Sequence, residues 1–226
     1  MQEKVIVVTG ASGALGKVVA ETALARDARV AAIDFAVAQD TAPGKRLELG
    51  GVDLTDAAQA RKAIDAAAAH FGRIDALVNI AGGFAFETVA DGDPKTWQRM
   101  YALNVTTALN ASRAAIPHLL RRPAARIVNI GAFGALQAGN GMGAYAASKA
   151  GVHRLTEALA AEHKGRITVN AVLPSIIDTA ANRDSMPKAD FSRWVSPQEL
   201  AEVILFLASD AASAVTGALV PVTGRV

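Results

Sequence analysis

The stretch Val5-Ile6-Val7-Val8-Thr9-Gly10-Ala11-Ser12-Gly13-Ala14-Leu15-Gly16 decides the fold of this chain. Its first five residues form an apolar, β-branched run that is typical of a buried strand. Three glycines follow, and an amphipathic segment then continues to Arg26. A strand that leads through a glycine-rich turn into a helix predicts a βα unit.

The same alternation continues along the chain. Apolar runs predict strands at 29–34, 74–79, 126–130, 167–173 and 217–222, and helical periodicity covers 56–71, 94–120, 143–163 and 197–207. Asp93 and Ser196 stand where N-caps of two of these helices are expected. This order predicts an α/β fold, a single Rossmann-type doubly wound parallel sheet flanked by helices on both faces. We expect one domain over residues 1–226.

One long segment, residues 175–195, lacks clear periodicity and is rich in polar residues. A loop of this length in a compact domain is usually a lid or a binding loop. We therefore predict a substrate loop here. The alternative is a solvated excursion with one short helix.

Composition excludes several classes of function. The chain has 226 residues, a formal net charge of +2 and no cysteine, which excludes disulfides and thiol catalysis. No basic stripe or long apolar run is present, so we expect neither a nucleic-acid nor a membrane partner. No leader precedes the first strand, and a cytoplasmic location is expected. We expect no metal site, and surface or helix-capping positions for His70, His118, His153 and His163.

The glycine-rich turn and Asp34 together predict a dinucleotide site. The helix that starts after the turn offers free N–H groups to a pyrophosphate. Asp34 ends the second strand, 18 residues after Gly16, where a carboxylate binds the ribose hydroxyls of NAD and repels a 2′-phosphate. We predict NAD(H) as the preferred cofactor, with NADP(H) as the alternative. An ordinary βα turn and a solvated strand-end Asp34 are the alternatives for the motif itself.

Further motifs, Asn79-Ile80-Ala81-Gly82 and Tyr145-Ala146-Ala147-Ser148-Lys149, extend the pattern. With the glycine-rich turn they resemble the short-chain dehydrogenase/reductase family along nearly the whole chain. Gly10 and Gly16 match the glycines of that family, while Ala14 stands at the middle glycine. The resemblance implies an NAD(P)-dependent oxidoreductase with a small-molecule substrate, which assembles as a homodimer or homotetramer.

The resemblance also implies a cofactor site. Val52-Asp53-Leu54 is similar to the adenine-binding segment of the family, with the Asp53 carboxylate on the adenine amino group. Pro174 and Thr179 match the segment that holds the nicotinamide carboxamide. The residues implied to bind the cofactor are Gly10, Ser12, Gly13, Ala14, Leu15, Gly16, Asp34, Asp53, Leu54, Asn79, Ala81, Gly82, Lys149, Pro174, Ile177 and Thr179.

Tyr145 and Lys149 are the predicted catalytic pair. Residues four apart share a helix face, so the ammonium of Lys149 can lie beside the Tyr145 phenol. This ammonium, together with the positive charge of an oxidised nicotinamide, favours the phenolate and lowers a pKa that is about 10 for free tyrosine. The resemblance implies that Lys149 also binds the nicotinamide ribose, and that Asn104 completes the catalytic set by holding a water of the proton relay.

Ala132 is a departure from the family pattern. It stands 13 residues before Tyr145, where the family carries a serine that hydrogen-bonds the substrate carbonyl. Ser148 lies on a different helical face from Tyr145 and does not replace it. Three explanations remain open: engineered inactivation, a dead paralogue, or chemistry that needs no serine.

The third explanation is favoured by three stretches: Gly141-Met142 before Tyr145, Gly151-Val152-His153 after Lys149, and the segment from Val172 to Trp194. They resemble the dihydropteridine reductase branch of the family, which also has alanine at the position of Ala132. That branch reduces quinonoid dihydropterin with NADH. It carries a tryptophan where Phe84 stands here, and it lacks the asparagine found here as Asn104. We assign Phe84, Ala132 and Tyr145 to the substrate site, with Tyr145 as proton donor. The alternatives are a carbonyl or 3-oxoacyl reductase, in which backbone groups or water replace the serine, and a non-catalytic NAD(H)-binding sensor or scaffold.

Overall fold

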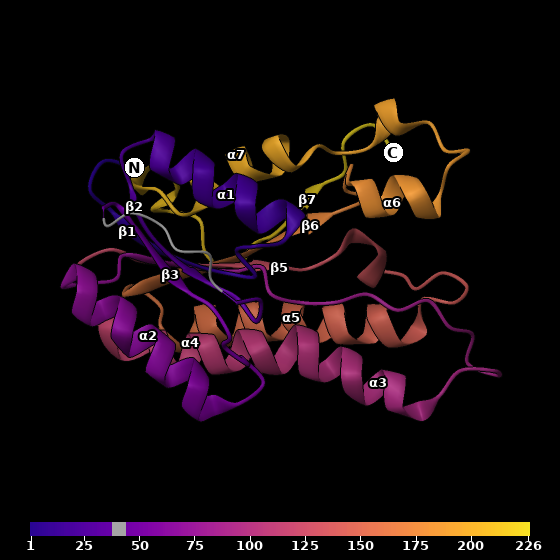
Figure 1. Ribbon diagram of the computed structural model, residues 1–226, viewed down its shortest axis with the longest axis horizontal. Helices are drawn as coiled ribbons and strands as arrows, with labels where there is room; N and C mark the ends of the chain where they lie inside the picture. The colour runs from indigo at the N-terminus through magenta and orange to yellow at the C-terminus, as the bar shows by residue number, and fades with distance from the viewer. Residues whose placement is uncertain (38–43) are drawn as a thin grey trace.

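Seven parallel strands form one sheet in the order β3-β2-β1-β4-β5-β6-β7 (Figure 1). The computed structural model describes residues 1–37 and 44–226. The strands are β1 (Val5–Thr9), β2 (Arg29–Ile33), β3 (Arg46–Leu49), β4 (Ala76–Asn79), β5 (Ala125–Ile130), β6 (Ile167–Pro174) and β7 (Leu219–Val222). The strand order reverses direction between β1 and β4, which opens a crevice at the carboxyl ends of these strands. The predicted doubly wound α/β fold is confirmed.

Helices cover both faces of the sheet (Figure 1). One face carries α1 (Ala14–Ala25) and α7 (Pro197–Leu207), and the other carries α2 (Ala57–Phe71), α4 (Thr107–Leu119) and α5 (Gly143–Glu162). Within β1, Ile6 and Val8 pack into the core below α1 and α7, while Val7 packs into the core below α2 and α4. Side chains of a strand alternate between faces, so a strand covered on both faces is apolar throughout.

The segment 94–120, predicted as one helix, is helical throughout, but one turn at its centre is not α-helical. It starts with α3 (Pro94–Tyr101), whose N-cap Asp93 accepts a hydrogen bond from Lys95 N at 2.8 Å. A π-helical turn over Ala102–Thr106 then leads into α4. Such turns are rare and often occur at functional sites. This one contains Asn104, and helical periodicity gave no signal for it.

One strand was not expected from the sequence, and the predicted loop contains short helical turns. The edge strand β3 was not predicted, because four residues with two charged side chains, Arg46-Leu47-Glu48-Leu49, are too short and polar to show a strand pattern. The segment 175–195 contains the short helix α6 (Ala180–Ser185) and a three-residue turn, Phe191–Arg193. Among the described residues, no helix is both long and apolar enough to cross a membrane.

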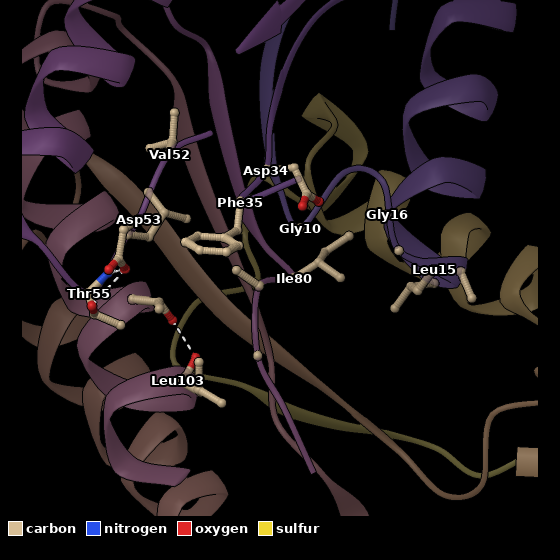
Figure 2. A pocket seen from close by; sticks show the side chains of 16 residues that line it. Gly10, Leu15, Gly16, Asp34, Phe35, Val52, Asp53, Thr55, Ile80 and Leu103 are labelled. Carbon is tan, nitrogen blue, oxygen red and sulfur yellow. Dashed lines mark hydrogen bonds between the residues drawn. The ribbon is translucent and has the colours of Figure 1, made fainter. Parts of the chain in front are cut away.

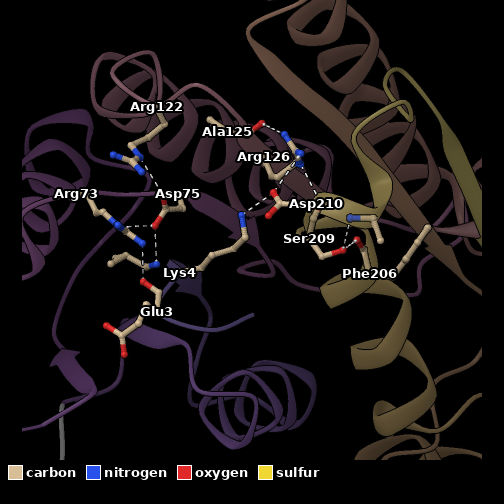
Figure 3. A network of polar contacts seen from close by, with 12 residues as sticks. Glu3, Lys4, Arg73, Asp75, Arg122, Ala125, Arg126, Phe206, Ser209 and Asp210 are labelled. Carbon is tan, nitrogen blue, oxygen red and sulfur yellow. Dashed lines mark hydrogen bonds and ion pairs between the residues drawn. The ribbon is translucent and has the colours of Figure 1, made fainter.

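Charged side chains close the amino edge of the sheet (Figure 3). The buried Asp75 carboxylate accepts hydrogen bonds from Val5 N at 2.8 Å, from Arg73 Nε at 2.8 Å and from Arg122 Nε at 2.9 Å. These contacts tie the start of β1 to the residues that precede β4 and follow α4. The charged contacts occupy the amino ends of the strands, so a ligand site is expected at their carboxyl ends.

We predict that Asp75→Ala lowers the free energy of unfolding by about 3 kcal/mol, because it leaves a buried N–H and two guanidinium groups without their shared acceptor. Urea unfolding followed by circular dichroism measures this. The matched control is Asp65→Ala, which removes an exposed carboxylate paired with His118 and should cost less than about 1 kcal/mol. Equal losses in the two variants would contradict the role given to Asp75.

Candidate active site

A cavity of about 570 Å³ opens at the carboxyl edge of the sheet (Figure 2). This carboxyl-edge cavity has the size of typical small-molecule and cofactor sites. Its walls come from the glycine-rich turn, the end of β2, the segment 52–55, the loop after β4 and the helical segment that contains the π-helical turn. Ten residues that the sequence assigned to the cofactor line it: Gly10, Gly13, Ala14, Leu15, Gly16, Asp34, Asp53, Leu54, Ala81 and Gly82.

The glycine-rich turn packs on its neighbours through bare backbone. Gly10 has φ +65°, and a Cβ on it would lie 2.8 Å from Ala81 N. A Cβ on Gly16 would lie 2.1 Å from the Gly10 carbonyl oxygen. These contacts exclude larger residues at both positions. Ala14, which replaces the expected middle glycine, is exposed in the first turn of α1, so its methyl group displaces no backbone.

The N-terminus of α1 is open to a ligand. Its N-cap, Gly13, makes no side-chain hydrogen bond, whereas Asp56, Asp93 and Ser196 cap α2, α3 and α7 with their side chains. The first N–H groups of α1 and the positive end of its dipole are therefore available to a phosphate. Together with the glycine contacts, this arrangement fits the pyrophosphate of a dinucleotide.

Asp34 extends from the end of β2 to the glycine-rich turn (Figure 2). Its Oδ2 accepts a hydrogen bond from Ser12 N at 2.8 Å, and its Oδ1 accepts one from Ala36 N at 2.9 Å. Ser12 thus contributes a backbone group that orients the carboxylate. The next residue, Phe35, is 74% exposed and also lines the cavity. Sequence reasoning missed Phe35, although an aromatic residue directly after a strand-end aspartate is a usable signal for an adenine contact.

Asp53 lies on the cavity wall beside Thr55 (Figure 2). Its Oδ1 accepts hydrogen bonds from Thr55 N at 2.8 Å and Thr55 Oγ1 at 2.7 Å, which fixes the carboxylate. Neither lysine nor arginine is among the residues that line the described cavity. With two carboxylates and no cation in its lining, the cavity disfavours an additional phosphate.

Besides Ser12 and Lys149, four predicted cofactor residues lie outside the lining of the cavity. Asn79 is buried, and its Nδ2 donates to Ser112 Oγ at 3.1 Å and to Asn129 Oδ1 at 2.9 Å. It therefore ties β4 to α4 and β5. The other three follow the core of β6 in sequence: Pro174 ends the strand, Ile177 forms an isolated bridge with Val195, and the Thr179 hydroxyl caps α6.

Lys149 extends from α5 towards the loop after β4. Its ammonium is buried and donates to the Ile130 carbonyl at 2.7 Å. A Cβ on Gly82 would lie 3.6 Å from Lys149 Nζ, so the ammonium lies next to the cavity wall. Burial lowers the pKa of Lys149 to about 8, because desolvation disfavours the charged form.

Tyr145 lies on the same face of α5, with its ring at the edge of the Phe84 ring and 5.0 Å between the ring centroids. Burial raises the pKa of Tyr145 to about 12. The expected lowering of this pKa by Lys149 is absent, because desolvation of the phenol dominates. The structure therefore holds Tyr145 in its protonated form.

Asn104 fixes the loop after β4 by hydrogen bonds to Gly83. Its Oδ1 accepts from Gly83 N at 3.0 Å, and its Nδ2 donates to the Gly83 carbonyl at 3.1 Å and to Ser148 Oγ at 2.9 Å. Both amide hydrogens are thus used by the protein. The Ser148 hydroxyl donates in turn to the Tyr145 carbonyl at 2.7 Å. Ser148 therefore joins Asn104 to the helix that carries Tyr145.

Ala132 follows β5 and is buried beside α5. Its N–H donates to Nε2 of His153 at 3.3 Å. His153 is only 2% exposed, so the surface or capping position expected for it is wrong. The usable signal was its spacing, four residues after Lys149 on the same helix face. Burial, together with the positive charges of Arg154 and Lys149, lowers the pKa of His153.

Comparison with known proteins identifies the family. The sequence matches the short chain dehydrogenase family over residues 4–190. It is 34% identical to 2-(S)-hydroxypropyl-CoM dehydrogenase 3 of Xanthobacter autotrophicus, covering 99% of this chain and 96% of that protein. It is 31% identical to a 3-oxoacyl-[acyl-carrier-protein] reductase of Thermotoga maritima, covering 99% and 98%. The chain belongs to the short-chain dehydrogenase/reductase family.

A solved structure gives the same result for the fold. Carveol dehydrogenase from Mycobacterium avium in complex with NAD superposes with a TM-score of 0.87 at 26% identity, covering 99% of this chain and 97% of that one. The predicted enzyme class, an NAD(P)-dependent oxidoreductase of this family, is confirmed. None of these relatives is a dihydropteridine reductase, so the family is shown but that branch is not.

We predict that Lys149→Met raises the free energy of unfolding of the cofactor-free protein by about 2 kcal/mol at pH 7. Removal of the buried charge contributes about 3 kcal/mol, and loss of the Ile130 hydrogen bond offsets about 1 kcal/mol. The pKa of Lys149 is about 8 in the folded chain against 10.5 unfolded. Between these values the unfolded state binds more protons, so wild-type stability should rise with pH and the gain of the variant should disappear.

Urea unfolding at several pH values between 7 and 10.5 measures this difference. The exposed Lys164→Met is the matched control and should show no such trend. A difference between wild type and Lys149→Met that does not change with pH would show that the ammonium is not desolvated.

Proposed function

We propose that this chain is an NAD(H)-dependent oxidoreductase in which Tyr145 gives a proton to the substrate. One observation carries the proposal: the Asn104 amide and the Lys149 ammonium meet at the bare backbone of Gly82 on the cavity wall, and Lys149 shares its face of α5 with Tyr145. The two carboxylates and the absence of a cation in the described lining favour NAD(H) over NADP(H).

The proposal assigns a separate role in cofactor binding or proton transfer to each part of the site. The open N-terminus of α1 binds the pyrophosphate, and the Asp34 carboxylate binds the adenosine ribose hydroxyls. The cofactor supplies the hydride when it is bound. Lys149 holds the nicotinamide ribose, and Tyr145 Oη donates the proton. A proton donor positioned in this way typically contributes about 10²–10⁴ in rate.

The substrate that fits this site best is a planar conjugated acceptor of the quinonoid dihydropterin class. Ala132 offers no hydroxyl, its N–H is taken by His153, and the Ser148 hydroxyl is taken by Asn104 and the Tyr145 carbonyl. A substrate carbonyl thus finds none of the donors that the family serine would give, and loss of such a donor costs about 3 kcal/mol in related oxyanion sites. An already polarised ring needs less activation. Phe84, 60% exposed at the edge of Tyr145, can stack on it.

A second candidate function is reduction of a simple carbonyl or 3-oxoacyl substrate. The names of the relatives favour it, since they are a hydroxypropyl-CoM dehydrogenase and a 3-oxoacyl reductase. In this case a water or a backbone group would replace the serine. A non-catalytic NAD(H) sensor is the third reading, and the retained Tyr145, Lys149 and Asn104 argue against it.

The remaining features belong to the same proposal. We place the whole chain in one cofactor-binding domain, with residues 175–195 as the substrate loop and Pro174, Ile177 and Thr179 near the nicotinamide. Trp97 and Tyr101 leave aromatic surface exposed on α3, which suits assembly into a homodimer or homotetramer in the cytoplasm.

The proposal predicts NADH oxidation with quinonoid dihydropterin, followed at the absorbance band of NADH. Tyr145→Phe should lower kcat at least 100-fold, because it removes the proton donor, while NADH binding measured by fluorescence is unchanged. A panel of ketones and a 3-oxoacyl thioester runs in parallel. Turnover confined to that panel would establish the second candidate and exclude the pterin. No turnover with any acceptor, with NADH still bound, would leave the sensor.

We predict that Asp34→Asn weakens NADH binding about tenfold, since it removes a charge-assisted hydrogen bond. NADPH binding should be unchanged or stronger, because the carboxylate that repels its 2′-phosphate is gone. Calorimetric titration with both cofactors measures the ratio of their dissociation constants. Asp53→Asn is the control and should weaken both cofactors equally, since adenine is common to them. Equal weakening of both by Asp34→Asn would refute the role assigned to Asp34.

A further inference from the structure

Three side chains form one row along the inner face of α5. Tyr145, Lys149 and His153 follow each other at intervals of four residues, so they point to the same side of the helix. The first two are assigned to catalysis under the proposed function. The third, His153, has no role there, although it is as deeply buried as Lys149.

Two residues of this row, Lys149 and His153, form hydrogen bonds to the end of β5. Lys149 Nζ donates to the Ile130 carbonyl at 2.7 Å, and His153 Nε2 accepts from Ala132 N at 3.3 Å. The residue between them, Gly131, bonds through its N–H to the Val172 carbonyl on β6 at 2.9 Å. The three residues at this strand end are therefore anchored on both sides, to α5 and to the neighbouring strand.

The imidazole lies directly on the backbone of Gly131. A Cβ at this position would lie 2.5 Å from His153 Nε2 and 3.1 Å from Leu173 Cδ1. Any larger residue would push the ring away from the strand. The close contact shows that the imidazole fills a fitted space and restricts the path of the chain from Ile130 to Ala132.

The hydrogen bond requires the neutral form of His153. A histidine nitrogen accepts a hydrogen bond only when it carries no proton, so Nε2 is the bare nitrogen here. The charged groups that act on the ring are Lys149 and Arg154, and both are positive. Glu157 is engaged with Arg154 at 2.9 Å. Protonation would therefore place a positive charge on a buried ring beside the buried Lys149 and remove the acceptor of the Ala132 N–H.

We propose that neutral His153 is a positioning residue that fixes the Ile130–Ala132 strand end, and through the Ile130 carbonyl the ammonium of Lys149, so that protonation of His153 at acid pH releases this segment and lowers turnover. The effect on turnover rests on the proposed function, whereas the hold of His153 on Ala132 does not. Acid by itself does not deprive the reduction of its proton donor, because Tyr145 is protonated throughout this range.

The first experiment follows the folded protein by NMR, without any substrate. The imidazole resonances of the four histidines and the amide resonance of Ala132 are recorded as the pH is lowered, and His153→Gln assigns the signal of His153. We expect His153 to titrate below the usual range of an imidazole, and the Ala132 amide to move with the same midpoint. An Ala132 amide that does not follow His153, or a His153 that titrates within the usual imidazole range, would overturn the proposal.

The second experiment measures turnover of NADH with the acceptor found active above. His153→Gln keeps an oxygen that can accept from Ala132 N and cannot be protonated, so it should retain kcat within about threefold at neutral pH and lose the decline on the acid side. His153→Leu fills the space without an acceptor and should lower kcat about tenfold at every pH, an effect of the size expected for one unsatisfied buried N–H. His163→Gln, at the end of α5, is the control and should keep the wild-type pH profile.

The outcomes separate the two proposals. An acid decline that persists in His153→Gln would refute the positioning role, even if the enzyme is active. Absence of turnover in the wild type would refute the proposed function, while the coupled titration of His153 and Ala132 would still support the hold on the strand end. Should His153→Leu prevent folding, the NMR titration of the wild type and the pH profile of His153→Gln decide.

Discussion

The contact between bare backbones at Gly10, Gly16 and Ala81 is the constraint on which the rest of this structure depends. Gly10 meets the backbone of Ala81, and Gly16 meets the carbonyl of Gly10, at separations that a side chain would not allow. Because of these contacts, the start of α1 and the ends of β1 and β4 meet at one point. The open helix N-terminus, Asp34 and the loop after β4 thereby face a common cavity, and a dinucleotide can reach the backbone of all three.

On the other side of the cavity, buried polar groups hold the candidate catalytic residues. Asn104 in the π-helical turn binds Gly83 and Ser148, and Lys149 binds the Ile130 carbonyl. Each of these side chains is paired with backbone or with another buried group, as burial requires. The cost falls on Lys149, because burial disfavours its charged form and lowers its pKa to about 8. Functional residues often reduce stability in this way.

The surroundings of Ala132 limit the hydrogen-bond donors that the site can offer to a substrate carbonyl. The nearby hydroxyl of Ser148 is committed to Asn104 and the Tyr145 carbonyl, and the N–H of Ala132 is committed to His153. Under the proposed function, activation of the substrate is therefore left to Tyr145 and to the substrate itself. Because these donors are already used, the proposed site favours a polarised ring over a simple ketone; the family relationship alone does not distinguish them, since one fold hosts many substrates and specificity lies in the site.

The sequence by itself determined the βα units and the helix caps at Asp93 and Ser196, because strand and helix periods and cap residues act over a few neighbouring residues. Its glycine-rich turn and its resemblance to the family determined most of the cavity lining. Only the tertiary structure decided how buried polar groups are paired. It placed Asn79 in the core and gave the Asn104 amide to Gly83. It also raised the pKa of Tyr145 where the spacing to Lys149 had suggested a lower value. His153 was expected at the surface and lies on the strand end at Ala132. The physical reason is that a polar side chain and its partner are often tens of residues apart, and desolvation depends on every element packed around it.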